Sequence, residues 1–192
     1  MTQTPSFPLL NHPAFRGLSD ASASSLERGC NVLRFELGGQ LCDPKDIPAR
    51  ILVILQGQAR LVGRHNGRLT TVGKFGPGSV IGAASLLCGA PCENVIAAEE
   101  VIACAISDEL WRELYSSEAS FRQWCDQQLW PQELLQLLEA LEQNTAETDS
   151  SALEKLEDAL QCAERCSPDP AAVDAALAAG NQLYVTSAWG GL

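Results

Sequence analysis

The stretch that most constrains the fold is residues 75–98, a run of glycines, prolines and small apolar residues. A Gly-Pro-Gly turn at 76–78 leads through a short β-branched run to Gly82. Gly82 opens a short apolar helix over residues 83–88, which Gly89 closes. The N–H groups at such a helix start favour an anion. The stretch contains no Arg, Lys or His, so we expect a cradle shaped for an anion but without a cation.

The length of 192 residues allows one domain with an appendage, or two small domains. Apolar residues make up 46% of the chain, which is enough for a core. No run approaches the roughly 20 apolar residues of a membrane helix, and the first ten residues lack the order of a secretory signal. We expect a cytoplasmic protein without a membrane span in this stretch. The alternative location is the cytoplasmic face of the membrane, where this stretch would be part of a larger protein.

The net charge of −11 is unevenly distributed. Residues 132–174 contain seven Glu and four Asp against Lys155 and Arg165, so this region carries −9 and the first 131 residues carry −2. Direct binding of nucleic acid needs a basic face, so we exclude it. The acidic region is typical of a solvated helical surface.

The chain contains eight cysteines. Four stand alone, and the others form the pairs Cys88/Cys92 and Cys162/Cys166, each with three intervening residues. Buried packing is the usual role of cysteine in a cytosolic protein. Metal binding by four thiolates and a redox pair remain alternatives, and the sequence does not decide whether either pair is active.

The first half of the chain has the pattern of short strands with Gly and Pro turns. Strands are expected around residues 32–37, 40–42, 51–55, 58–64, 68–75, 94–98 and 101–106. Asn66-Gly67 is the strongest hairpin signal. Close spacing of such strands indicates an antiparallel jelly-roll barrel, so the fold class is mainly β plus α.

Helical segments flank this β region. Ser19 and Ser107 are expected N-caps of helices over 21–28 and after 107. One helix is expected over 118–129 with a bend or restart at Pro131, then a leucine stripe from Leu134 to Leu141. Further helices are expected over 151–166 and 171–179, and a strand over 182–186. The expected domains are a helical lead-in (1–29), the barrel (30–116), its C-terminal helices (117–143) and an acidic helical linker or start of a following module (144–192).

Residues 34–114 resemble the cyclic nucleotide-binding domain of the catabolite activator protein and cyclic-nucleotide-dependent kinase superfamily. The matching features follow in the family's order: Gly39, residues 51–59, Gly67-Arg68, residues 75–82, Leu86-Leu87, Gly89, Pro91 and Ala98. The resemblance implies a β-barrel coupled to flanking helices, with residues 75–98 as the phosphate-binding cassette.

The cassette departs from the family pattern at the positions that hold the ligand. The resemblance implies an acid after the glycine for the ribose 2′-hydroxyl and an arginine after the proline for the cyclic phosphate. Ala83 and Cys92 stand there instead, and Glu93 replaces the small hydroxyl residue that usually follows. Losing two charged hydrogen bonds costs about 3–6 kcal/mol, or on the order of 10²–10⁴ in affinity.

The candidate site therefore consists of a degenerate cassette with weak or no ligand expected: Gly82, Ala83, Ala84, Ser85, Cys92 and Glu93. The amides near Gly82, Ala83 and Ala84 are expected to hold at most a weak anion. A cation from Arg60, Arg64, Arg68 or Lys74 is an alternative. No cofactor is favoured, although binding of cAMP, cGMP or another small anion stays open.

The sequence favours a non-catalytic regulatory or docking domain. We expect the N-terminal part of a larger bacterial protein, such as a peptidase-containing ABC exporter. Its partners would be other domains of a longer chain or proteins that contact the acidic, leucine-striped helices, and a homodimer is possible. The alternative is the ligand-sensing domain of a Crp-type transcriptional regulator.

No catalytic or metal site is expected. A cupin-like metal enzyme would need clustered His and Glu, and the chain has only His12 and His65. His12, directly before a proline, is expected to be a turn residue rather than a ligand. Ser85 lacks a nearby base, so an enzyme is not supported.

Overall fold

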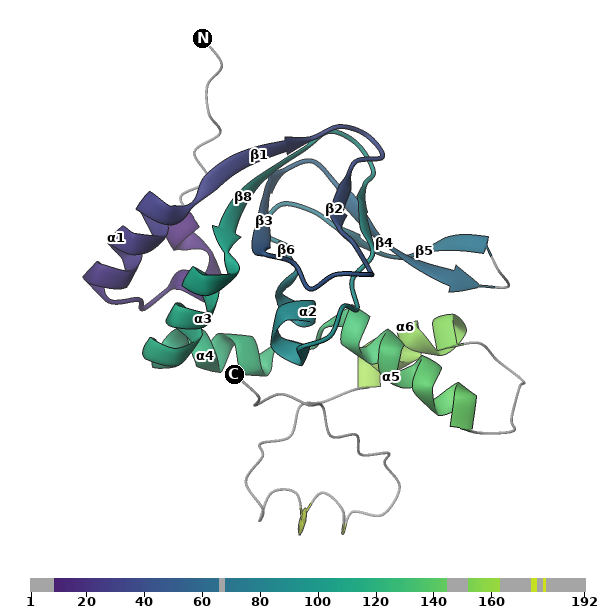
Figure 1. Cartoon of the computed structure of the whole chain (residues 1–192). Coiled ribbons are helices and arrows are strands. Elements are labelled where there is room, and N and C mark those ends of the chain that lie inside the picture. Colours follow the sequence, from purple (N-terminus) through teal and green to yellow (C-terminus); the bar gives the residue numbers. More distant parts are fainter. Residues whose placement is uncertain (1–8, 66–67, 145–151, 163–173, 176–177, 179–192) are drawn as a thin grey trace.

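The computed structural model describes residues 9–65, 68–144, 152–162, 174–175 and 178 (Figure 1). The strands are β1 Asn31–Phe35, β2 Gln40–Cys42, β3 Arg50–Gln56, β4 Ala59–His65, β5 Arg68–Phe75, β6 Val80–Ile81, β7 Val95–Ala97 and β8 Val101–Ser107. The helices are α1 Asp20–Gly29, α2 Ala83–Cys88, α3 Asp108–Ser117, α4 Ala119–Gln127, α5 Pro131–Asn144 and α6 Ala152–Cys162, preceded by the 3-10 turns η1 Leu9–Asn11 and η2 Pro13–Phe15.

The strands form two antiparallel four-stranded sheets. One sheet has the order β1-β8-β3-β6 and the other β2-β7-β4-β5. The first strand thus lies beside the last and the second beside the seventh, the arrangement of a double-sheet jelly roll. The prediction of antiparallel strands with flanking helices is confirmed. The strands assigned in the described residues lie in two separate sheets rather than in one closed barrel.

Strand β3 explains why its sequence is a continuous apolar run. Its side chains alternate between two cores: Ile51 and Val53 pack with the helices, whereas Leu52 and Ile54 pack between the sheets. All four are at most 2% exposed. Because both faces of the strand are covered, no polar alternation survives in the sequence.

Aromatic side chains join the N-terminal segment to the helices after β8. Phe15 stacks on Phe121 with ring centroids 5.8 Å apart, and Trp111 meets Phe121 edge-on at 4.8 Å. Trp124 continues the cluster to Trp130, 6.0 Å away. Burial of large aromatic side chains against one another is stabilising. This cluster therefore fixes α3 and α4 at the helical end of the sheets (Figure 1).

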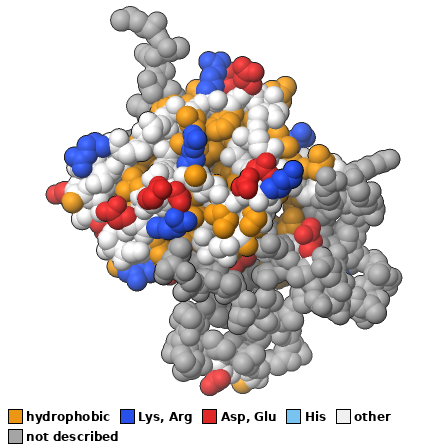
Figure 2. All heavy atoms as spheres, in the orientation of Figure 1, with side chains coloured by type: hydrophobic (Ala, Val, Ile, Leu, Met, Phe, Trp, Pro, Cys, Tyr) orange, Lys and Arg blue, Asp and Glu red, His pale blue; other side chains and the backbone are white. Residues whose placement is uncertain are grey.

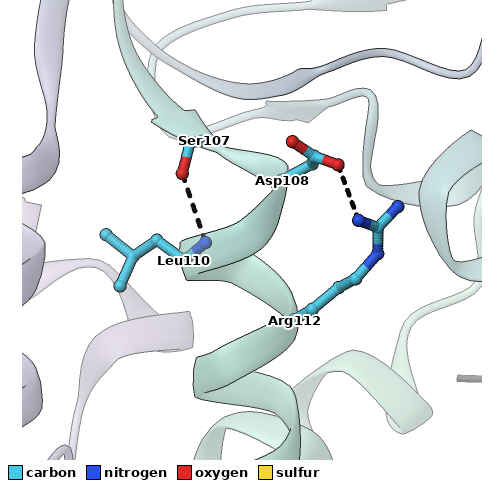
Figure 3. Close-up of polar contacts among 4 residues, drawn as sticks. All are labelled: Ser107, Asp108, Leu110 and Arg112. Carbon is cyan, nitrogen blue, oxygen red and sulfur yellow. Dashed lines mark hydrogen bonds and ion pairs between the residues drawn. The ribbon is translucent and has the colours of Figure 1, made fainter.

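Both predicted N-caps are confirmed. The hydroxyl of Ser19 accepts from the backbone N–H of Ser22, and that of Ser107 accepts from Leu110. Figure 3 shows the second cap, together with the ion pair of Asp108 and Arg112 one turn apart at 2.7 Å. The acid in the first turn also complements the helix dipole.

The predicted helix over residues 118–129 and its restart at Pro131 are confirmed, with the first helix one residue shorter at its start and two at its end. Helix α4 ends at Gln127, and α5 begins at Pro131, so residues 128–130 form a break. Proline at the first helical position loses no hydrogen bond, which explains why the break falls there. No helix in the described part of the chain is long and apolar enough to cross a membrane.

The leucine stripes of α5 and α6 pack on each other. Leu135 and Leu156 form the centre of this contact, with Leu134, Leu138 and Leu160 around it. Val72 of β5 also packs there, so the pair of helices lies against the second sheet. The predicted hairpin tip at 66–67, the end of the helix at Cys166, most of the helix over 171–179 and the strand over 182–186 lie outside the described residues.

Candidate functional site

The backbone of the cassette is set by two glycines in the left-handed region. Gly82 has a φ of 94° and caps the start of α2, and Gly89 has a φ of 66° at its end. A Cβ on Gly82 would lie 3.1 Å from the side chain of Pro48 and 3.3 Å from the carbonyl oxygen of Arg50. Only glycine combines this φ with this close approach.

The carboxyl group of Glu93 lies inside this cradle. Its Oε1 atom accepts from the backbone N–H of Gly82 at 2.8 Å, and its Oε2 atom accepts from that of Ser85 at 3.0 Å. Glu93 is 0% exposed. Two amides at the start of α2 are therefore already bonded to a carboxyl group of the chain itself, at a place where helix N–H groups favour an anion.

A side chain from α5 completes the surroundings of Glu93. The Nε2 atom of Gln132 donates to Oε1 of Glu93 at 3.0 Å, although 39 residues separate the two. Gln132 is 1% exposed, and within the described residues its Oε1 atom has no hydrogen-bond partner. Glu93 thus links the cassette to α5.

The electrostatics of Glu93 reflect two opposing effects. Burial raises the pKa of Glu93 above its ordinary value of 4.5, because an apolar interior disfavours the charged form. The hydrogen bonds from Ser85, Gly82 and Gln132 oppose that rise. Within the described residues, Glu93 forms no ion pair with a basic side chain.

The two other altered positions of the cassette are small and weakly polar. Ala83 is fully buried and offers no carboxylate. The backbone N–H of Cys92 donates to the hydroxyl of Ser85 at 3.1 Å. The neighbouring thiol of Cys88 and burial raise the pKa of Cys92, so its thiol stays neutral. Burial likewise raises the pKa of the nearby Cys42 to about 12.

The predicted alternative source of positive charge is not brought to the cassette by the described residues. Arg60 and Lys74 face each other across β4 and β5 and are exposed. The side chains of Arg64 and Arg68 lie outside the described part.

Figure 2 shows acidic and basic side chains interspersed over the visible face. Among the described residues, no cluster of His, Cys, Asp and Glu could hold a metal ion.

His12 has a structural role beside the cassette turn. Its Nδ1 atom accepts from the backbone N–H of Ala14 at 3.1 Å, and its Nε2 atom lies 2.8 Å from the carbonyl oxygen of Gly78. These partners require the proton on Nε2. The prediction of a turn residue is confirmed, and His12 additionally ties the N-terminal segment to the turn before β6.

All six predicted site residues lie in or beside α2, and the structure adds Gln132. Gly82, Ser85, Cys92 and Glu93 form one hydrogen-bonded group, whereas Ala83 and Ala84 contribute buried apolar surface. The sequence showed Glu93 as an unusual residue but not that it faces inward. For Gln132 no signal existed, because a glutamine in an acidic, leucine-rich helix is unremarkable.

Comparison with known proteins bears on the domain that carries this site. The family model described as "Cyclic nucleotide-binding domain" matches residues 32–118. The chain is similar to the regulatory domain of Toxoplasma gondii PKA, solved with cAMP, at 14% identity and a TM-score of 0.53 over 78% of this chain and 53% of that one. It is also similar to the catabolite activator protein of Thermus thermophilus, at 21% identity and a TM-score of 0.50 over 58% of this chain and 53% of that one.

At these identities, the likeness shows the fold. The chain spans about half the length of each of these two structures. No curated protein compared with the chain matches it.

Proposed function

Because residues 32–118 form a domain of the cyclic nucleotide-binding superfamily, we propose that this chain is a regulatory or docking domain that has lost recognition of cAMP and cGMP. The observation that carries the proposal is the carboxyl group of Glu93 on the amides of Gly82 and Ser85. A phosphate at this place would have to displace a carboxyl group that is part of the chain, and the charged form of that group would repel it.

The loss of the two ligand-holding groups acts in the same direction. Ala83 supplies no acceptor for a ribose hydroxyl, and the neutral thiol of Cys92 supplies no positive charge. Two missing charged hydrogen bonds weaken binding by about 3–6 kcal/mol. The desolvated carboxyl group in the cradle adds to this penalty.

Calorimetric titration with cAMP and with cGMP tests the proposal. We expect no saturable heat below about 0.1 mM nucleotide, since a loss of 10²–10⁴ in affinity moves a micromolar Kd to roughly 0.1–10 mM. Micromolar binding of either nucleotide by the wild-type chain would overturn it.

A restored cassette is the matched positive control. The triple variant Ala83→Glu, Cys92→Arg and Glu93→Ala returns the acid and the arginine and removes the internal carboxyl group. We expect this variant to bind a cyclic nucleotide at least about 100-fold more tightly than the wild type. The double variant that keeps Glu93 should bind more weakly than the triple variant.

The proposal extends to how such a domain would act. With the nucleotide site closed, the helices after β8 would transmit or receive signals through contacts with other domains or proteins. The acidic charge of residues 132–174 suits partners with basic surfaces. A place ahead of peptidase and ATPase modules of an exporter stays a prediction, which the coding sequence beyond Leu192 would test.

A further inference from the structure

We propose that Glu93 and Gln132 form a latch that holds α5 on the cassette, so that the chain's own carboxyl group fixes the position of the α5–α6 pair. The latch deepens the proposed function and rests on it. In this arrangement, the position of α5 does not depend on any small molecule.

The latch begins at a single oxygen atom. Oε1 of Glu93 accepts both from the backbone N–H of Gly82 and from Nε2 of Gln132. One carboxyl group therefore joins the start of α2, the segment after the cassette helix and the first turn of α5. Breaking either side of this group leaves donors without an acceptor in a buried place.

The contact with Glu93 offsets part of the free-energy cost of burying the Gln132 side chain. A glutamine side chain at 1% exposure loses its hydration, which is unfavourable unless hydrogen bonds replace it. Its Oε1 atom has no hydrogen-bond partner among the described residues. The bond from Nε2 to Glu93 is thus the polar contact that accompanies its burial.

The latch affects the position of both α5 and α6. Helix α5 contacts α2 and packs along α6, and the leucines between them form a small core of their own with Val72. The break at residues 128–130 separates α5 from α4. Because the α5–α6 pair meets the sheet through Val72 and has a non-helical connection to α4, opening of the latch should loosen this pair before the two sheets.

Hydrogen exchange of the full chain, followed by mass spectrometry, tests the latch. The variant Gln132→Met keeps the length and apolar packing of the side chain and removes the donor. We expect amides of residues 134–144 to exchange at least about 10-fold faster than in the wild type, while those of β3 and β8 keep their rates. The control Gln127→Met, an exposed position of α4, should leave all rates unchanged.

Wild-type exchange rates over residues 134–144 in Gln132→Met would overturn the latch. If that variant exchanges faster throughout the chain, Gln132→Asn replaces it, because the shorter side chain places its amide about one carbon–carbon bond short of Glu93. Unchanged α5 rates in Gln132→Asn would then overturn the proposal, and faster rates confined to α5 would support it. Nucleotide binding by the wild-type chain would contradict the proposed function without altering this readout.

Discussion

The Oε1 atom of Glu93 lies 2.8 Å from the backbone nitrogen of Gly82, eleven residues earlier in the chain. Glu93 lies in the segment that follows α2, and this contact places its carboxyl group at the start of that same helix. The start of α2 thus presents its amides to a partner within the chain itself. The stability of the domain should consequently depend on Glu93.

Replacement of Glu93 by alanine should destabilise the domain. The change leaves the N–H groups of Gly82 and Ser85 and the amide of Gln132 without their acceptor. We expect a loss of about 2–4 kcal/mol in the free energy of unfolding, measured by urea denaturation. The exposed Glu99 is the matched control, and Glu99→Ala should stay within about 0.5 kcal/mol of the wild type. Equal stability of the two variants would contradict the buried contact.

The burial of Glu93 also predicts a pH dependence. Its folded pKa lies above 4.5, so between 4.5 and that value the folded state binds more protons than the unfolded state. The contribution of this group to the free energy of unfolding is therefore full below pH 4.5 and is lost as the pH rises through the folded pKa. Glu93→Gln should remove this dependence, and Glu99→Gln should retain it. Urea denaturation at several pH values gives the comparison, and identical profiles for wild type and Glu93→Gln would argue against it.

The contribution of His12 to the free energy of unfolding should have the opposite pH dependence. Burial lowers the pKa of His12 below 6.5, so its contribution is present above pH 6.5 and is lost as the pH falls through the lowered pKa. The variant His12→Phe keeps the ring contacts with Phe15 and Trp124 but loses both hydrogen bonds. We expect a loss of about 1–3 kcal/mol at pH 7.5 and a flatter acid limb in thermal denaturation. A variant as stable as wild type would show that the bond to Gly78 contributes nothing.

Alanine substitutions at three glycines distinguish the destabilisation caused by an unfavourable φ from that caused by steric crowding of the new Cβ. Gly82 and Gly78 both have a positive φ, but a Cβ on Gly82 would press on Pro48 whereas one on Gly78 would meet nothing within 4 Å. Gly78→Ala should cost about 1–2 kcal/mol from the φ alone, and Gly82→Ala should cost more. Gly76→Ala has neither problem and serves as the baseline. The order of the three melting temperatures checks the prediction, and a Gly82 variant as stable as the Gly76 variant would refute it.

The elements that depend on local signals could be predicted from the sequence. The hydroxyl caps at Ser19 and Ser107, the buried strand after Arg50 and the glycines around α2 follow from spacing and residue type alone. The direction of Glu93 could not be predicted, because it lies in an irregular segment between Gly89 and β7 where no periodicity assigns a face. The contact with Gln132 depends on how α5 returns to the cassette, which is a property of tertiary packing.

The most direct measurement of the central claim is the pH titration of the backbone amide protons of Gly82 and Ser85 by NMR. If both donate to the carboxyl group of Glu93, their chemical shifts should change together, with one midpoint above 4.5, and Glu93→Gln should abolish the change. Amide shifts that stay flat in the wild type, or that titrate equally in Glu93→Gln, would show that Glu93 does not occupy the cradle.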